Sequence, residues 1–311
     1  MKRKTAGIVA IIIIIVCIGY IVYDIITGRS DKKVIIEQED RFQDINTNWD
    51  VINELRFPDG ILKAVASSKD AIYCGGDTFL VCLDLEYQEQ WSLNTGIPPV
   101  NALCFNNDTL YAATDDRIML YDRYGTMLGE WGPYDDGAYI TGISANRNFL
   151  AIADAGNKHV FVVDKSGALK SIIGYPGNQF IIPSFYFDVA LTSFDTLLVA
   201  NTGKRQIEFR TIDGTLIRAI GEEGDSFRDF CGCCNPAHFA LTPEGYIVTA
   251  EKGINRIKIL LTSGKLVEPV AQLGIFKASI PLDIAVGENG LIYGAYSGNS
   301  TLYTFERILI R

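Results

Sequence analysis

Short apolar stretches that end at glycine, aspartate or asparagine recur from about residue 58 to the C-terminus. In six of them an apolar run leads through a turn to a second apolar run, and they begin at residues 71, 109, 149, 196, 246 and 291. Another short apolar run precedes each one, and most are followed by one more, so each unit holds four predicted strands. Six four-stranded units predict an all-β fold, a six-bladed β-propeller of four-stranded antiparallel blades.

The ends of the repeat region predict how the ring closes. The last unit, "LIYGAYSGNSTLYTFER", reaches its third strand and then has no outer strand, whereas "WDVINELRFPDG" (residues 49–60) precedes the first inner strand without a unit of its own. We expect residues from about 50 to 57 to supply the outer strand of the last blade, which leaves no open blade edge. The propeller domain is therefore expected over residues 50–311.

The N-terminus has a different pattern, "MKRKTAGIVAIIIIIVCIGYIVYDIITG". The uncharged stretch from Thr5 to Tyr23 would span roughly 28 Å as a helix, about the thickness of a bilayer core. The basic residues at positions 2–4 predict a cytoplasmic N-terminus. Residues 1–29 are thus expected to form a cytoplasmic tip and a single transmembrane signal anchor, followed by a polar linker over residues 30–49 and an extracytoplasmic propeller, periplasmic or extracellular. A cleavable signal peptide is the alternative, although no A-x-A-like site follows the apolar run.

The composition of the chain narrows the range of possible functions. Hydrophobic residues make up 48% of the 311 residues, enough for a full core, and the net charge is −9. An acidic chain lacks the basic surface that nucleic-acid binding needs. Links rich in aromatic residues, such as "EWGPYDDGAYI", instead suit a binding surface for an unidentified protein or small ligand.

The best units are "NPAHFALTPEGYIVTAEKGINRIKILLTSGKLV" and "FLAIADAGNKHVFVVDKSGALKSIIG". They carry a Pro-x-x-apolar inner strand, a second strand ending in Ala-Asp or similar, a Gly-Asn-x-x turn, and an aspartate or serine before glycine. This pattern resembles the NHL-repeat family over about residues 58–311, although the first two units are degenerate. The resemblance implies a scaffold that usually binds partners, and only a minority of relatives are enzymes.

Alignment of the six units places a polar residue at the start of every inner strand. Because these strand starts surround the mouth of the central channel, they are candidates for a ring of groups around a ligand or an ion. The alternative is that strand starts are polar because solvent reaches them. The six residues are Lys63, Asn101, Thr141, Asp188, His238 and Asp283.

The longest link between blades, "GEEGDSFRDFCGCCNP", carries Cys231, Cys233 and Cys234 and ends just before His238. Such links are expected on the loop-rich top face, where propellers commonly bind ligands. One interpretation is a soft-metal site for zinc or copper that uses these thiolates and His238. A second is a disulfide within the loop, since the extracytoplasmic environment is often oxidising. A third is a set of buried free thiols.

No catalytic motif stands out in the sequence. The Gly-x-Ser-x-Gly elbow, the phosphate-binding loop and HExxH are all absent from it. We therefore assign no catalytic residue and expect a membrane-tethered scaffold that binds a protein or ligand through its top face. The alternative is a redox or metal-binding accessory protein that uses the CGCC loop, and a lyase-type or lactonase-type propeller enzyme is a further alternative.

Overall fold

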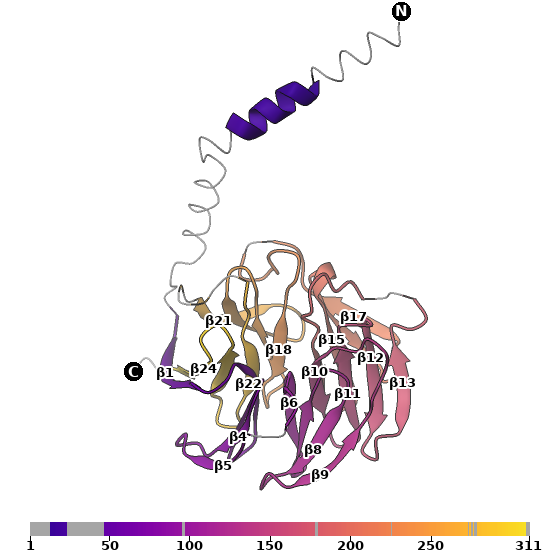
Figure 1. The fold of residues 1–311 in the computed structure, drawn as a ribbon, viewed down its shortest axis with the longest axis vertical. Helices are drawn as coiled ribbons and strands as arrows, with labels where there is room; N and C mark the ends of the chain where they lie inside the picture. Colours follow the sequence, from indigo (N-terminus) through magenta and orange to yellow (C-terminus); the bar gives the residue numbers. More distant parts are fainter. Residues whose placement is uncertain are drawn as a thin grey trace, which may run out of the picture. The chain divides into compact units, whose positions relative to one another are not determined.

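The computed structural model describes residues 13–23, 47–94, 97–177, 180–224, 226–272, 274, 276 and 279–308. Contacts divide the chain into two units, residues 1–43 and residues 44–311. The second unit holds six four-stranded antiparallel sheets, which confirms the predicted six-bladed β-propeller (Figure 1). The blades lie at the positions that the sequence units predict, because each blade is built from strands that are consecutive in sequence, except at the point of closure.

Five blades take their strands in chain order from the inside outward. The first three are formed by β2 (Leu62–Ser67), β3 (Ile72–Gly76), β4 (Leu80–Leu83) and β5 (Glu89–Leu93); by β6 (Ala102–Asn106), β7 (Thr109–Ala113), β8 (Ile118–Asp122) and β9 (Met127–Trp131); and by β10 (Ile140–Ala145), β11 (Phe149–Asp154), β12 (His159–Asp164) and β13 (Leu169–Ile173). The fourth is formed by β14 (Val189–Leu191), β15 (Leu197–Asn201), β16 (Gln206–Arg210) and β17 (Leu216–Ile220), with a short 3-10 helix at Thr202–Lys204. The fifth is formed by β18 (His238–Leu241), β19 (Ile247–Ala250), β20 (Arg256–Leu260) and β21 (Leu266–Gln272).

The sixth blade joins the two ends of the propeller. Its strands are β22 (Asp283–Val286), β23 (Ile292–Tyr296), β24 (Thr301–Arg307) and, outermost, β1 (Trp49–Arg56). In Figure 1 the indigo strand β1 lies beside the yellow strand β24, and the antiparallel register runs from Trp49 opposite Arg307 to Arg56 opposite Thr301. The strand begins at Trp49, inside the segment expected to be linker.

The core consists of apolar clusters that lie between neighbouring blades. One cluster joins Val160 and Val162 of the third blade to Val189 and Val199 of the fourth. The same arrangement recurs at each of the other five blade interfaces. Second strands such as β3 and β15 are buried at every position because a neighbouring blade covers each face. This explains why they are continuous apolar runs in the sequence instead of alternating ones.

Turns between third and outer strands explain the recurring aspartate and glycine. Asp164 Oδ1 accepts hydrogen bonds from the backbone N–H groups of Ser166 and Ala168. Gly167 has a φ of 84°, a conformation that favours glycine, and a Cβ there would lie 2.9 Å from Trp131 Cε2 of the preceding blade. The turn motif therefore also packs one blade against the next.

The expected signal anchor falls mostly outside the described residues, as do residues 30–46 of the linker. Residues 13–23 form a helix. Among the helices that the structure describes, none has the length and apolar character needed to cross a membrane. The membrane anchor stays a prediction from the sequence.

Candidate functional site

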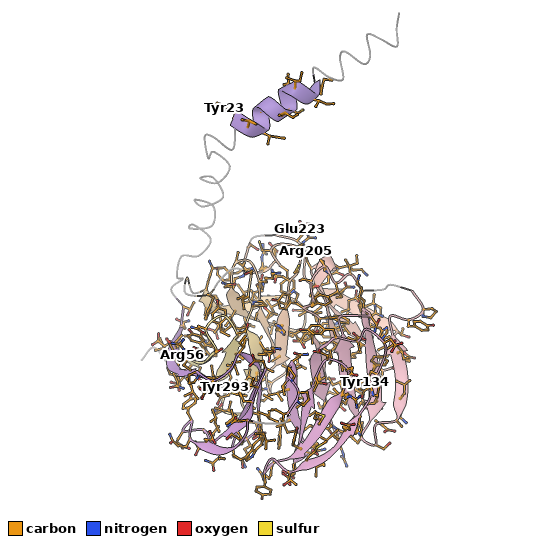
Figure 2. The ribbon with its side chains drawn as sticks, in the orientation of Figure 1. Tyr23, Arg56, Tyr134, Arg205, Glu223 and Tyr293 are labelled. Carbon is orange, nitrogen blue, oxygen red and sulfur yellow. The ribbon has the colours of Figure 1, made fainter. Side chains whose placement is uncertain are left out.

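One face of the propeller gathers two kinds of loop, the links between blades and the turns between second and third strands. The link before the fifth blade contacts that blade's own turn, because Lys252 N–H donates to Asn235 Oδ1 at 2.7 Å. It also contacts the fourth blade, where Arg205 Nε donates to the Gly232 carbonyl at 2.6 Å. Figure 2 shows Arg205 beside Glu223 on this link, and their charged groups are 3.1 Å apart. The CGCC segment is thus part of the loop-rich face.

The polar strand starts meet at the centre of this face. A cavity of about 180 Å³ is lined by five of the six predicted residues, namely Lys63, Asn101, Thr141, His238 and Asp283. The sixth residue, Asp188, lines a second cavity of about 250 Å³ between the inner strands, which Thr141 and Asp283 also line. The predicted residues therefore lie around the channel mouth, with Asp188 and Asp283 facing the channel.

Three of these residues form a compact cluster from three consecutive blades. His238 Nδ1 lies 3.4 Å from Asp283 Oδ1 and 3.7 Å from Asp188 Oδ2. Their side chains are only 12%, 17% and 10% exposed for His238, Asp283 and Asp188, respectively. Among the described residues, this is the group of histidine, cysteine and acidic side chains whose ligand atoms converge, all within 4.8 Å of one another. The cluster could hold a metal ion or exchange a proton.

Burial and charge act against each other on this cluster. Burial alone would lower the pKa of His238, but the carboxylates of Asp188 and Asp283 outweigh it and raise that pKa above its ordinary value. Burial raises the pKa of Asp283 to about 6, opposed by His238 and reinforced by Asp188. Burial and the neighbouring charges therefore shift the pKa values of both His238 and Asp283 upward, as is common at functional sites.

Both carboxylates are held in place by backbone groups of a neighbouring blade. Asp188 Oδ2 accepts a hydrogen bond from Phe239 N–H of the fifth blade at 2.9 Å. Asp283 Oδ2 accepts one from Val65 N–H of the first blade, also at 2.9 Å. This leaves Asp283 Oδ1 directed at His238. The cluster is thus fixed by blade-to-blade contacts instead of by a mobile loop.

The remaining ring residues, from the first three blades, supply further polar groups to the mouth. Lys63 Nζ donates to Asn101 Oδ1 at 3.3 Å, and Asn101 Nδ2 donates to Asp115 Oδ1 at 2.8 Å. Thr141 Oγ1 donates to the Phe187 carbonyl at 2.8 Å. The mouth therefore presents an ammonium group as well as the carboxylate of Asp283.

Three aromatic residues also line the cavity, and they come from the aromatic-rich links for which the sequence suggested a binding surface. Tyr139, Phe185 and Tyr186 all line the cavity. The Tyr186 ring meets the His238 ring edge-on, with centroids 5.7 Å apart, and Lys252 Nζ lies 5.0 Å from the centre of the Tyr186 ring. The signal in the sequence was the aromatic run "SFYF" in the third inter-blade link.

The cysteine cluster lies on the same face but is separate from the triad of Asp188, His238 and Asp283. The Sγ atoms of Cys233 and Cys234 are 3.2 Å apart, and no disulfide bond joins them. Cys233 is exposed, whereas Cys231 and Cys234 are buried. Burial raises the pKa of the Cys234 thiol, and the neighbouring Cys233 thiol raises it further. The structure brings His238 together with the two aspartates instead of with these thiols.

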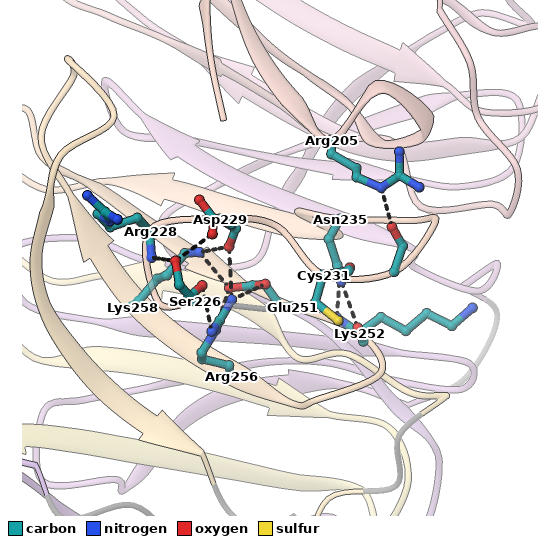
Figure 3. A network of polar contacts seen from close by, with 11 residues as sticks. Arg205, Ser226, Arg228, Asp229, Cys231, Asn235, Glu251, Lys252, Arg256 and Lys258 are labelled. Atoms are coloured by element: carbon teal, nitrogen blue, oxygen red, sulfur yellow. Dashed lines mark hydrogen bonds and ion pairs between the residues drawn. The ribbon is translucent and has the colours of Figure 1, made fainter. Parts of the chain in front are cut away.

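A buried ion cluster, missed in the sequence, fixes the cysteine-bearing loop (Figure 3). Arg256 donates from Nε and Nη2 to the two oxygens of Glu251, both at 2.9 Å, and its Nη2 also donates to the Asp229 carbonyl at 2.9 Å. Lys258 Nζ donates to the same carbonyl at 2.6 Å and lies 2.9 Å from Glu251 Oε1. Charged side chains from the fifth blade thus hold the backbone just before the CGCC segment.

Comparisons with known proteins support the fold alone. No protein-family model and no curated protein sequence matches the chain, so the NHL resemblance stays a prediction. Similar solved structures include a streptogramin B lyase (12% identity, 83% of this chain and 97% of that one, TM-score 0.61). They also include catalytically inactive virginiamycin B lyase from Staphylococcus aureus with quinupristin (14%, 83% and 99%, TM-score 0.59) and the WD40 domain of Neurospora crassa Pan2 (10%, 86% and 98%, TM-score 0.59). At such identities the likeness shows that the chain is a β-propeller and assigns it no activity.

Proposed function

We propose that the protein is a membrane-tethered, extracytoplasmic binding propeller that takes a small polar ligand at its channel mouth. The observation that carries this proposal is the convergence of polar strand starts from different blades on one cavity that three aromatic side chains also line. Tethering and location rest on the apolar N-terminal segment of the sequence.

The size and the polar groups of the cavity also limit which ligands can bind. Its volume of about 180 Å³ is below the roughly 300 Å³ typical of sites for drug-sized molecules. Lys63 and Asp283 both line the cavity and suit a ligand with both an acceptor group and a donor group, and Tyr186 offers an aromatic ring. An amino acid, a short organic acid or a monosaccharide has this size and chemistry.

Ligand-observed NMR with a library of such compounds tests this function. Compounds that bind the wild-type protein should lose binding in Ser297→Trp, because Ser297 lines the cavity and an indole would fill it. Ser263→Trp is the matched control, because Ser263 is exposed in the turn between β20 and β21. Equal binding in both variants would show that the ligand does not bind at the channel mouth. A library without any binder would contradict small-ligand binding.

A second candidate is a redox accessory function of the CGCC loop. It is favoured by the 3.2 Å separation of the Cys233 and Cys234 sulfurs and by the exposure of Cys233. Thiol titration before and after reduction, together with a triple serine variant at positions 231, 233 and 234, tests it. If the variant changes only stability and no thiol pair cycles, the redox function is wrong.

A further inference from the structure

Two carboxylates from different blades converge on one buried nitrogen. His238 Nδ1 is buried and has no hydrogen-bond partner, although Asp283 Oδ1 and Asp188 Oδ2 lie 3.4 and 3.7 Å away. A ring nitrogen carries at most one proton and can satisfy only one acceptor at hydrogen-bonding distance. Both distances exceed the usual 2.7–3.2 Å of an N–H···O bond, so a hydrogen bond does not explain the geometry.

The same distances fit a shared cation. Histidine nitrogen and aspartate oxygen bind Zn²⁺ at about 2.0–2.2 Å, which places neighbouring ligand atoms of a tetrahedral site roughly 3.3–3.6 Å apart. The separations of 3.4 and 3.7 Å from His238 Nδ1 are close to that range. We propose that Asp188, His238 and Asp283 bind one divalent first-row transition-metal ion, such as Zn²⁺ or Mn²⁺, at the channel mouth.

The ligand atoms are already held in position. Asp283 uses Oδ2 for the Val65 N–H and so keeps Oδ1 for an ion, while Asp188 is fixed by the N–H groups of Val189 and Phe239. The Tyr186 ring packs against the imidazole. Hydrogen bonds to the ligands of this kind orient metal sites and strengthen binding.

Three protein ligands leave at least one position of the ion open. His238 and Asp283 line the channel mouth, so an ion that they hold would be accessible from that cavity. Sites with three protein ligands and an open position bind water or a small molecule there. The inference rests on the same site as the proposed function and adds the ion through which a carboxylate or hydroxyl group of the ligand would be held.

The other histidine supplies an internal comparison. His159 Nε2 lies 3.6 Å from Asp154 Oδ2 and 4.0 Å from Asp135 Oδ2, a similar arrangement at first sight. However, the Asp135 Oδ2 atom lies farther from its ring nitrogen than either carboxylate of the triad does, and half of the Asp135 side chain is exposed. We therefore expect the ion at His238 and not at His159.

Metal titration of the full-length, chelator-stripped protein tests the inference, with Zn²⁺ alone or Mn²⁺ alone as the probe. Calorimetry for both ions and electron paramagnetic resonance for Mn²⁺ should show one ion per chain. Asp283→Asn and His238→Gln should each weaken binding at least tenfold, whereas His159→Gln, the matched control, should leave it unchanged. The triple serine variant of the CGCC loop should also keep the Mn²⁺ site, which separates it from the thiols.

Two outcomes would overturn the inference. One is the absence of stoichiometric binding of either ion to protein that shows wild-type thermal unfolding. The other is binding that survives in the Asp283→Asn, His238→Gln double variant, which would place the ion elsewhere. Small-molecule binding is tested separately, by the Ser297→Trp comparison. A failure of the metal site can therefore be distinguished from a failure of the proposed function.

Discussion

The carboxylate of Asp283 accepts a hydrogen bond from the backbone N–H of Val65 at 2.9 Å, and this contact connects the last blade to the first across 218 residues of sequence. Asp188 makes the equivalent contact from the fourth blade to Phe239 of the fifth. Both aspartates therefore connect neighbouring blades and also belong to the triad. Formation of the candidate site is coupled to correct assembly of neighbouring blades.

Asparagine and alanine at position 283 should differ in stability. Asn keeps an acceptor oxygen for the Val65 N–H, whereas Ala leaves that buried donor without a partner. We expect Asp283→Ala to be less stable than Asp283→Asn by about 1–3 kcal/mol. Urea unfolding in the presence of a chelator measures this. Equal stability of the two variants would mean that the contact does not hold the blades together.

Closure of the ring by β1 should depend on one face of that strand. Leu55 packs in the cluster between the sixth and first blades, whereas Ile52 points away and is 47% exposed. Leu55→Asp should lower the free energy of unfolding by about 1–3 kcal/mol, because it removes apolar burial and buries a charge. Ile52→Asp should change it by less than about 0.5 kcal/mol. Thermal and urea unfolding of both variants check this, and similar losses in the two would contradict the described register of β1.

Lys258 should make the propeller more stable as the pH rises above 8. Burial lowers its pKa to about 8, although the Glu251 carboxylate partly opposes this. In the unfolded chain the pKa is about 10.4, so between these values the unfolded state binds more protons and stability increases with pH. For this group the gain is up to about 3 kcal/mol across that window. Glu251 keeps its two contacts with Arg256 when Lys258 loses its proton.

The variant Lys258→Met isolates this contribution because it keeps the packing volume and removes the titrating group. The stability difference between the wild type and Lys258→Met should shift in favour of the wild type from pH 8 to pH 10.5, as followed by urea unfolding. A difference that is constant over this range would show that Lys258 titrates normally.

The fold was predictable because blade strands are local in sequence and their second strands are buried on both faces. The ring of strand starts was predictable for the same reason, since equivalent positions in the units occupy equivalent places around the axis. The approach of Asp188, His238 and Asp283 to within 4.8 Å was not, because it depends on the rotamers of side chains from three blades. Nor was the ring contact of Tyr186 with His238, because Tyr186 lies in an irregular link without strand alternation.

The buried ions show a signal that the sequence analysis did not use. Arg256 and Lys258 alternate with isoleucine in "RIKIL", and both are almost fully buried. In "IEFR" of the fourth blade, Glu208 and Arg210 show the same spacing, and their charged groups are 2.6 Å apart. Two charges at i and i+2 on a third strand lie on one face of the sheet, where a neighbouring blade and the loops above it must provide partners.

The thiols should differ sharply in reactivity. Cys233 is exposed, whereas burial raises the pKa of Cys82 and of Cys104 to about 11 and also raises that of Cys74 and Cys234. Since the thiolate is the nucleophile, iodoacetamide at pH 8 should label Cys233 well before the other cysteines of the propeller. Mass-spectrometric mapping over time checks this order, and urea should make all propeller cysteines react alike. Early labelling of Cys234 together with Cys233 would instead mean that the loop opens, and that the contacts of Arg256 and Lys258 with the Asp229 carbonyl do not hold it in place.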